Sequence, residues 1–250
     1  MKENWVHPFY KKQFEYFHDS LDDLNDYKKE VALIHEQVGK PFKDVLEIGA
    51  GSGILASTLS LTNKDITTVE LVSELVEYAK AHSNPSINIL CDNFYSVRLS
   101  NQFDLVLYLD GFGVGTDKDQ LLLLQRIHEW LKDDGYALID IYEPNYWKNV
   151  KGQQMLVVGK SQIKREYGYD DNNCRMTDTL WQTDSPNETI TQTLACYSTD
   201  EINSLCLQAG LQIIAFYPGG AMNFNTWRFE EVASLSNCLS YRIKVKKVKS

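Results

Sequence analysis

Three glycines at alternating positions follow a short apolar segment, and their spacing has a clear chemical meaning. The segment reads Val45-Leu-Glu-Ile-Gly-Ala-Gly-Ser-Gly53, with the carboxylate of Glu47 just before the glycines. Glycine reaches backbone conformations that other residues avoid, and it lets a ligand touch the main chain because it has no side chain. A strand that leads through such a turn into a helix is therefore expected to cradle a ligand at a sheet edge.

The glycine spacing argues against a dinucleotide cofactor. A dinucleotide-binding turn has the pattern G-x-G-x-x-G, which sets the pyrophosphate on the helix N-terminus. Here the glycines occupy positions 49, 51 and 53, and position 54 is Ile. A nicotinamide-dependent oxidoreductase is therefore disfavoured. The remaining alternative is an ordinary glycine-rich turn between a strand and a helix.

Acidic residues close the next two apolar segments. Glu70 ends the run Ile-Thr-Thr-Val-Glu70, and Asp92 follows the run Ile87-Asn-Ile-Leu-Cys91. A carboxylate at the end of a buried strand is costly unless a partner satisfies it, and a diol that donates two hydrogen bonds is a suitable partner for Glu70. The alternatives are that Glu70 caps the following helix and that Asp92 only forms a turn.

The elements that must position these residues alternate between strand and helix. Apolar runs predict strands over residues 44–48, 65–71, 87–91, 103–109 and 136–142, and amphipathic patterns predict helices over 54–61, 72–82 and 118–131. Capping-box patterns open helices at Thr116 and at Ser198. This alternation implies right-handed crossovers and a parallel, doubly wound sheet.

Other patterns flank this core. An apolar stripe from Leu21 to Val38 predicts a helix that Gly39 and Pro41 stop. Residues 163–167, 175–182 and 189–197 are expected to form antiparallel strands, and residues 211–217 and 237–248 complete the sheet, the last as an antiparallel return.

The predicted fold class is α/β, a Rossmann-like, seven-stranded and mostly parallel sheet with a helical N-terminal arm and an inserted antiparallel β cap. The predicted division is a helical arm or lid over residues 1–40, a cofactor-binding core over 41–160, a substrate cap over 161–197 and the completion of the sheet over 198–250.

Composition restricts the classes of function. The 250 residues are 43% hydrophobic and carry a formal net charge of −9, which argues against broad contact with nucleic acid. The longest aliphatic run, residues 121–124, is far shorter than a membrane span, and the N-terminus lacks the profile of a signal peptide. The five cysteines and five histidines form no metal-ligand spacing. We therefore expect a soluble, cytoplasmic protein without a metal.

With its glycine turn, Glu70 and Asp92 in this order, the chain from Asp44 to its end resembles the class I S-adenosylmethionine-dependent methyltransferases that act on small molecules. The resemblance implies that the glycine turn holds the methionine part of S-adenosylmethionine, that Glu70 binds both ribose hydroxyls and that Asp92 meets the adenine amino group. The cofactor-binding residues that it implies, with two tyrosines of the arm, are Glu47, Gly49, Ala50, Gly51, Gly53, Glu70, Leu71, Asp92, Asn93, Phe94, Tyr108, Leu109, Tyr10 and Tyr16.

Methyl transfer from a sulfonium is an in-line displacement, so the protein must chiefly hold the nucleophile, methyl and sulfur in line. A base is needed only where the accepting atom is protonated. The candidate catalytic residues are Asp110, Glu143 and His7, although Asp110-Gly111 also fits a turn, Glu143-Pro144 a strand end and His7-Pro8 a loop. The candidate substrate-binding residues are Phe112, Tyr142, Arg165, Tyr167, Arg175, Trp181 and Met222.

The sequence thus predicts a methyltransferase that acts on an N or O atom of a small molecule. The alternative is a partner or sensor protein of the same fold that binds the cofactor without transferring its methyl group. The acceptor and the oligomeric state stay open at this stage.

Overall fold

A seven-stranded sheet forms the centre of the protein, a computed structural model of which describes residues 5–18, 24–157 and 160–249. The strand order is β10-β13-β5-β4-β1-β2-β3. The strands are β1 (Asp44–Ile48), β2 (Asp65–Glu70), β3 (Asn88–Cys91), β4 (Phe103–Tyr108), β5 (Leu131–Tyr142), β10 (Leu211–Pro218) and β13 (Ser240–Lys247). β13 runs antiparallel to both of its neighbours, as the sequence predicts.

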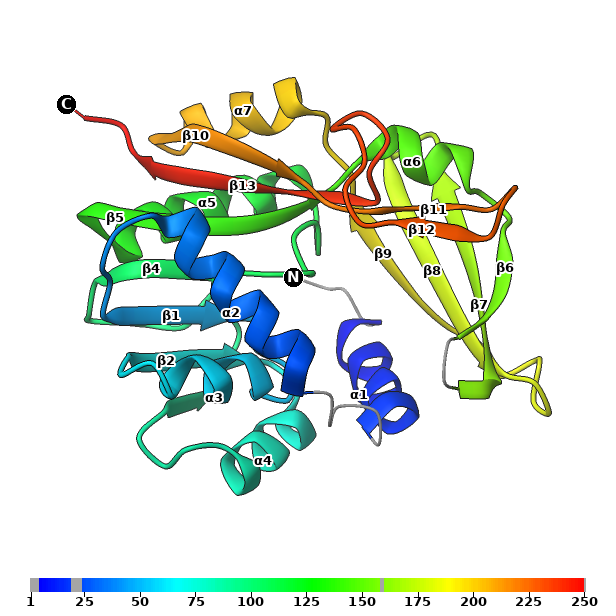
Figure 1. Cartoon of the computed structure of the whole chain (residues 1–250), viewed down its shortest axis with the longest axis horizontal. Helices are drawn as coiled ribbons and strands as arrows, with labels where there is room; N and C mark the ends of the chain where they lie inside the picture. The colour runs from blue at the N-terminus through cyan, green and yellow to red at the C-terminus, as the bar shows by residue number, and fades with distance from the viewer. Residues whose placement is uncertain (1–4, 19–23, 158–159, 250) are drawn as a thin grey trace.

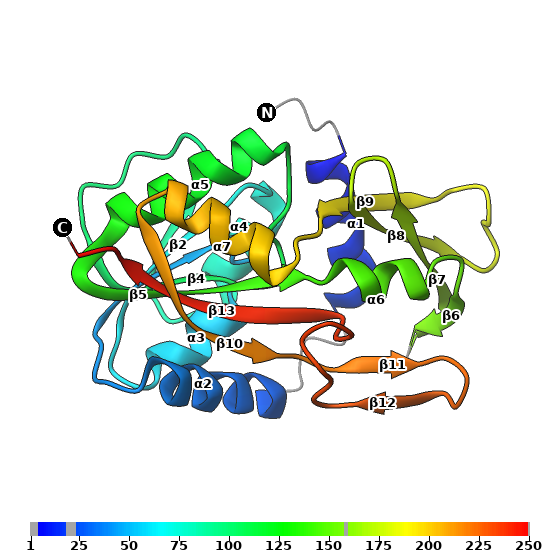
Figure 2. The ribbon, with the colours of Figure 1, turned by 90° about the horizontal axis from the view of Figure 1, so that it is seen from above.

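Helices cover both faces of this sheet (Figure 1, Figure 2). α2 (Leu24–Val38) and α3 (Ile54–Ser60) pack on one face, and α5 (Asp117–Trp130) and α7 (Thr199–Gln208) pack on the other. β4 is apolar and buried over residues 105–107 because Leu105 and Leu107 contact the first layer while Val106 contacts the second. The predicted class, a doubly wound α/β fold, is confirmed.

Both predicted capping boxes are present. The side chain of Thr116 accepts the Asp119 N–H while the Asp119 carboxylate accepts the Thr116 N–H at 2.8 Å, and Ser198 and Glu201 repeat the arrangement at the start of α7. α2 ends at Val38, and Gly39 follows with φ +67°, a helix-terminating conformation that favours glycine. Leu21, the first residue of the predicted apolar stripe, lies outside the described residues.

A second, four-stranded antiparallel sheet stands beside the main sheet. Its order is β6-β7-β8-β9, and its strands are β6 (Gln154–Val157), β7 (Lys160–Asp170), β8 (Arg175–Gln182) and β9 (Ile190–Ala195). We call this sheet the cap. α1 (Val6–Phe17) lies between the cap and α4 (Ser73–His82), as Figure 1 shows. The division of the chain into arm, core, cap and completion stays a prediction.

The sequence pattern does not predict four of the elements. α6 (Pro144–Asn149) follows β5 where we expect only a strand end, and β6 and the hairpin of β11 (Ala221–Asn223) and β12 (Arg228–Glu230) are also unforeseen. α6 has six residues, too few to show a helical period, and its start depends on the Glu143 side chain, which accepts the Tyr146 N–H. The hairpin strands have three residues each, too few to show alternation.

Gly113 joins the end of β4 to the cap. Its carbonyl accepts the Ala195 N–H at 3.0 Å, its φ is +113°, and a Cβ there would lie 2.5 Å from the Ala195 nitrogen. Any side chain at this position must therefore push the two sheets apart.

Gly113→Ala should destabilise the protein by about 2–5 kcal/mol, because overpacking against backbone adds to the strain of a positive φ. Urea unfolding measures this change. Gly152→Ala is the matched control, since Gly152 also has a positive φ of +82° but nothing lies within 4 Å of its added Cβ, so only about 1 kcal/mol of strain is expected. Equal losses in the two variants would contradict the role assigned to Gly113.

Candidate cofactor and substrate site

A cavity of about 440 Å³ lies at the carboxyl ends of β1, β2 and β4. This is the edge at which open α/β sheets bind ligands. The predicted site residues that line the cavity are Glu47, Gly49, Ala50, Gly51, Glu70, Leu71, Asn93, Phe94, Tyr108, Leu109, Asp110 and Tyr10. They come from the main sheet, the turns that follow its strands, and α1.

The glycine turn forms one wall of the cavity because its backbone is left-handed at three alternating positions. Gly49, Gly51 and Gly53 have φ values of +66°, +55° and +75°, a region that L side chains rarely adopt. Gly49 is also close to Tyr108, whose Cε2 atom would lie 3.2 Å from an added Cβ. Gly53 itself does not line the cavity: it precedes α3, and a Cβ there would lie 2.9 Å from the Cβ of Ala79.

The Glu70 carboxylate ties the glycine turn to the end of β2. One oxygen, Oε2, accepts the Gly51 N–H at 2.8 Å, and the other, Oε1, accepts the Val72 N–H at 2.8 Å. Glu70 is 8% exposed, and burial raises its pKa although these backbone hydrogen bonds oppose the shift. The alternative interpretation, in which Glu70 caps the following helix, holds in part: the Glu70 carboxylate binds the N–H of Val72, which is the N-cap residue of α4.

Glu47 is a buried acid with an unsatisfied oxygen. Its Oε2 atom has no hydrogen-bond partner among the described residues, and the residue is 6% exposed. Burial, with the charge of Glu70 as a second cause, raises the pKa of Glu47 to about 8. A ligand group that donates hydrogen bonds or carries positive charge would satisfy this carboxyl group.

Asp110 forms the opposite end of the cavity. It lines the cavity as a solvent-accessible residue, and its φ of +56° is an uncommon value for a residue other than glycine. The Tyr142 hydroxyl donates a hydrogen bond to Asp110 Oδ1. Burial raises the pKa of Asp110 to about 6, although the hydrogen bond from Tyr142 opposes the shift. Asp110 is therefore mostly ionised at neutral pH.

α1 roofs the cavity. Val6, Tyr10, Gln13, Phe14 and Phe17, which recur at helical spacing, all line it. The helix is held on both sides: the Tyr10 hydroxyl donates to Gln192 Oε1 of β9 at 3.4 Å, and Lys11 Nζ lies 2.6 Å from Glu74 Oε1 of α4. The Phe14 and Tyr78 rings are in edge contact, with centroids 5.1 Å apart.

Most of the α1 residues that line the cavity were not predicted from the sequence. Tyr10 and Tyr16 were predicted, but Tyr16 packs against cap residues Ile163 and Leu180 and does not line the cavity. Gln13, Phe14 and Phe17 were not predicted as site residues. The signal was available, since the three- and four-residue spacing from Val6 to Phe17 defines one helix face.

Two of the three candidate bases do not line the cavity. The Glu143 carboxylate accepts the Tyr146 N–H at 2.8 Å and caps α6, so its position after β5 serves the helix start. His7 Nε2 lies 3.5 Å from Glu74 Oε2 at the outer side of α1. Asp110 alone of the three reaches the cavity. Asp92 is exposed and accepts the neighbouring Asn93 N–H at 2.6 Å, so Asn93 takes the place in the lining that we expected for Asp92.

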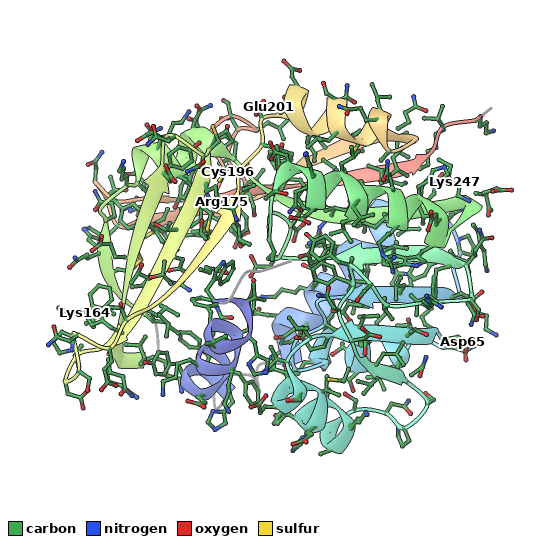
Figure 3. The ribbon with its side chains drawn as sticks, turned by 180° about the vertical axis from the view of Figure 1, so that it is seen from behind. Asp65, Lys164, Arg175, Cys196, Glu201 and Lys247 are labelled. Atoms are coloured by element: carbon green, nitrogen blue, oxygen red, sulfur yellow. The ribbon has the colours of Figure 1, made fainter. Side chains whose placement is uncertain are left out.

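The predicted substrate residues also lie outside this lining, for different physical reasons. Arg175 donates to the carbonyl groups of Gly113 and Gly115 and so joins the cap to the β4 end, beside Cys196 in Figure 3. Phe112 is a fully buried core residue, Trp181 is half-buried in β8, and Met222 lines a second cavity with Tyr146. Tyr142, Arg165 and Tyr167 belong to a buried layer behind Asp110, in which the Arg165 Nε atom lies 3.0 Å from Asp178 Oδ1.

Two absences hold for the part of the chain that the structure describes. None of its helices is both long and apolar enough to cross a membrane. No group of three or more His, Cys, Asp or Glu side chains there is placed to hold a metal ion.

Comparison with known proteins agrees with this geometry. Residues 45–135 match the methyltransferase domain family. Over this range the chain is similar to methyltransferase domains. The matched range runs from the glycine turn through the Glu70 and Asp110 ends of β2 and β4, and the predicted resemblance to S-adenosylmethionine-dependent methyltransferases is confirmed.

Solved structures support the fold over the whole chain. The CcbJ methyltransferase from Streptomyces caelestis has a TM-score of 0.74 and 15% identity, with 96% of this chain and 98% of that chain covered. An S-adenosylmethionine-dependent methyltransferase from Clostridium acetobutylicum has a TM-score of 0.70 and 13% identity, with 95% and 97% covered.

Among curated proteins, uncharacterised methyltransferases of Bacillus mycoides and Bacillus anthracis are 24% identical over 143 residues. This similarity spans 53% of this chain and 61% of theirs.

Glu47→Gln should flatten the dependence of stability on pH. The folded-state pKa of Glu47 is about 8, above the ordinary 4.5, so its contribution is fully present below pH 4.5 and is lost as the pH rises through about 8. In the wild type this loss amounts to at most about 5 kcal/mol. Urea unfolding between pH 5 and pH 9 measures it, with the exposed Glu77→Gln as control. Parallel pH curves for wild type and Glu47→Gln would contradict the burial of an unpaired acid.

Proposed function

We propose that this protein is an S-adenosylmethionine-dependent methyltransferase that acts on an N or O atom of a small molecule. The observation that carries the proposal is the pair of buried carboxylates, Glu47 and Glu70, on either side of a left-handed glycine turn in one cavity. An amino-acid nucleoside carries an ammonium group, which would satisfy the unpaired Oε2 of Glu47, and a ribose diol, which can donate to the lone pairs that Glu70 keeps beside its two backbone hydrogen bonds.

The lining fits the rest of such a cofactor. Leu71 and Phe94 offer apolar surface for an adenine ring, and Asn93 supplies a polar side chain beside them. The cavity volume of about 440 Å³ falls within the range of roughly 300–1,000 Å³ that is usual for ligand sites. The unsatisfied Oε2 of Glu47 is the clearest indication of a missing partner, because buried polar atoms are normally hydrogen-bonded.

The chain's own residues would then perform positioning and proton transfer. When bound, S-adenosylmethionine supplies an electrophilic methyl group on a sulfonium. Glu47, Glu70 and the glycine turn would fix the two ends of the cofactor, and Tyr108 and Asp110 would border the acceptor. α1 would exclude water, and alignment of this kind can supply several of the ~7–11 kcal/mol available from proximity.

The surroundings of the cavity favour a small acceptor. α1 lines the cavity and is tied to the cap by the hydrogen bond from the Tyr10 hydroxyl to Gln192, an arrangement that favours a compact acceptor over a polymer. The net charge of −9 disfavours nucleic acid and is in keeping with a cytoplasmic enzyme of small-molecule metabolism. Two structures of similar fold point the same way: CalS10 from Micromonospora echinaspora is an amino pentose methyltransferase, and MtfA is a glycopeptide N-methyltransferase.

Isothermal titration tests the cofactor. S-adenosylmethionine should bind the full chain, and Glu70→Ala should weaken binding at least about tenfold, because both the diol partner and the anchor of Gly51 are lost. Glu77→Ala, on the exposed face of α4, is the matched control. An unchanged dissociation constant in Glu70→Ala would contradict the site, and binding without methylation of any acceptor would indicate a sensor or partner protein instead.

Cofactor binding should also release a proton. The pKa of Glu47 is about 8 in the free protein, so this carboxyl is mostly protonated at pH 7, and an ammonium partner would lower that pKa. Titrations in buffers of different ionisation enthalpy should show release approaching one proton per site at pH 7. Glu47→Gln should abolish the release, and the same release in that variant would assign it to another group.

A further inference from the structure

The cavity has a strongly asymmetric charge. Three carboxylates line it, those of Glu47, Glu70 and Asp110, and no Lys or Arg is among its described lining residues. Glu47 and Glu70 are accounted for by the proposed cofactor, which leaves Asp110 for another ligand. The aromatic rings of Tyr10 and Tyr108 stand in the same lining and add electron-rich faces.

The groups around Asp110 do not neutralise its charge. The Tyr142 hydroxyl of β5 and the Tyr10 hydroxyl of α1 are uncharged, and Asp140 of β5 adds a second negative charge. The nearby cation, Arg165 of the cap, lies 3.0 Å from Asp178 and is balanced by it. Asp110 therefore presents a net negative charge to the cavity.

We propose that the methyl acceptor is the nitrogen of a basic amine, which enters as an ammonium ion and pairs with the Asp110 carboxylate. This inference rests on the proposed function and specifies its substrate class. An anionic acceptor, such as a carboxylate or a phosphate, would be repelled by the Asp110 carboxylate, whose charge no Lys or Arg of the described lining offsets.

Proton transfer decides between an amine and an alcohol. The pKa of Asp110 is about 6 and that of an alkylammonium is about 10, whereas an aliphatic hydroxyl is a far weaker acid. Removal of the proton by Asp110 is therefore uphill by about four pKa units for the amine and by much more for an aliphatic hydroxyl. Only the first is small enough for a carboxylate to serve as the base.

The step balances without a further reactant. The ammonium N–H bond breaks, its proton goes to Asp110 and its electron pair stays on nitrogen. That pair forms the new N–C bond while the C–S bond breaks and its electron pair stays on sulfur. The products are an N-methylammonium ion, the thioether and protonated Asp110, which loses its proton to solvent when the products leave.

An isotope experiment with the full chain tests the acceptor atom. S-adenosylmethionine that carries a ¹³C-labelled methyl group is incubated with the protein and a bacterial small-molecule extract, supplemented with matched amino, hydroxy and carboxy forms of the same sugars and aromatics. Carbon–proton correlation spectra separate N-methyl from O-methyl products. We expect label on nitrogen. Label on oxygen would overturn this inference and leave the proposed function standing, whereas no label despite cofactor binding would overturn the proposed function itself.

Variants test the part played by Asp110. Asp110→Asn should lower kcat by about 10²-fold or more while the dissociation constant for S-adenosylmethionine stays within about twofold. Asp171→Asn, on the exposed cap turn, is the control.

Tyr142→Phe provides a second test. Without the donated hydrogen bond the pKa of Asp110 rises, so the acidic limb of the pH–rate profile should move from about pH 6 to a higher pH. An unmoved limb, or full activity in Asp110→Asn, would overturn the assignment.

Discussion

The two hydrogen bonds that Glu70 accepts from the main chain are the constraint on which the site depends. They fix Gly51 of the turn and Val72 at the start of α4 to the end of a single strand. The turn can be held in this way only because left-handed glycines bring its N–H groups toward β2. One carboxylate thus shapes the wall of the cavity and remains part of its lining.

A second constraint is the shortage of positive charge around the buried acids. Burial raises the pKa of Glu47, Glu70 and Asp110 alike, since each carboxylate loses solvation that no lysine or arginine in the described lining restores. This desolvation cost arises at three carboxyl groups that line one cavity. Such an arrangement is stable as a folded protein, but it favours cationic ligands over neutral or anionic ones.

Local patterns determined how much could be predicted from the sequence. The turn at Gly49 to Gly53, both capping boxes and the alternation of strands and helices follow from residue spacing, because each depends on near neighbours. The directions in which side chains point at the strand ends cannot be predicted from residue spacing. Glu143 and Asp110 both follow strands, yet one caps α6 and the other faces the cavity. Asp92 and Asn93 are neighbours in the turn after β3, and only Asn93 lines the cavity.

The attachment of α1 to both α4 and the cap has a consequence for turnover. Because this helix lines the cavity, lifting it to release a ligand would break the ion pair of Lys11 with Glu74. That pair lies at the surface, with 44% and 35% of the two side chains exposed, so dissolved ions weaken it while the aromatic contacts of Phe14 are little affected. Ionic strength would then affect the rate at which the bound ligand leaves the site, independently of the rate of methyl transfer.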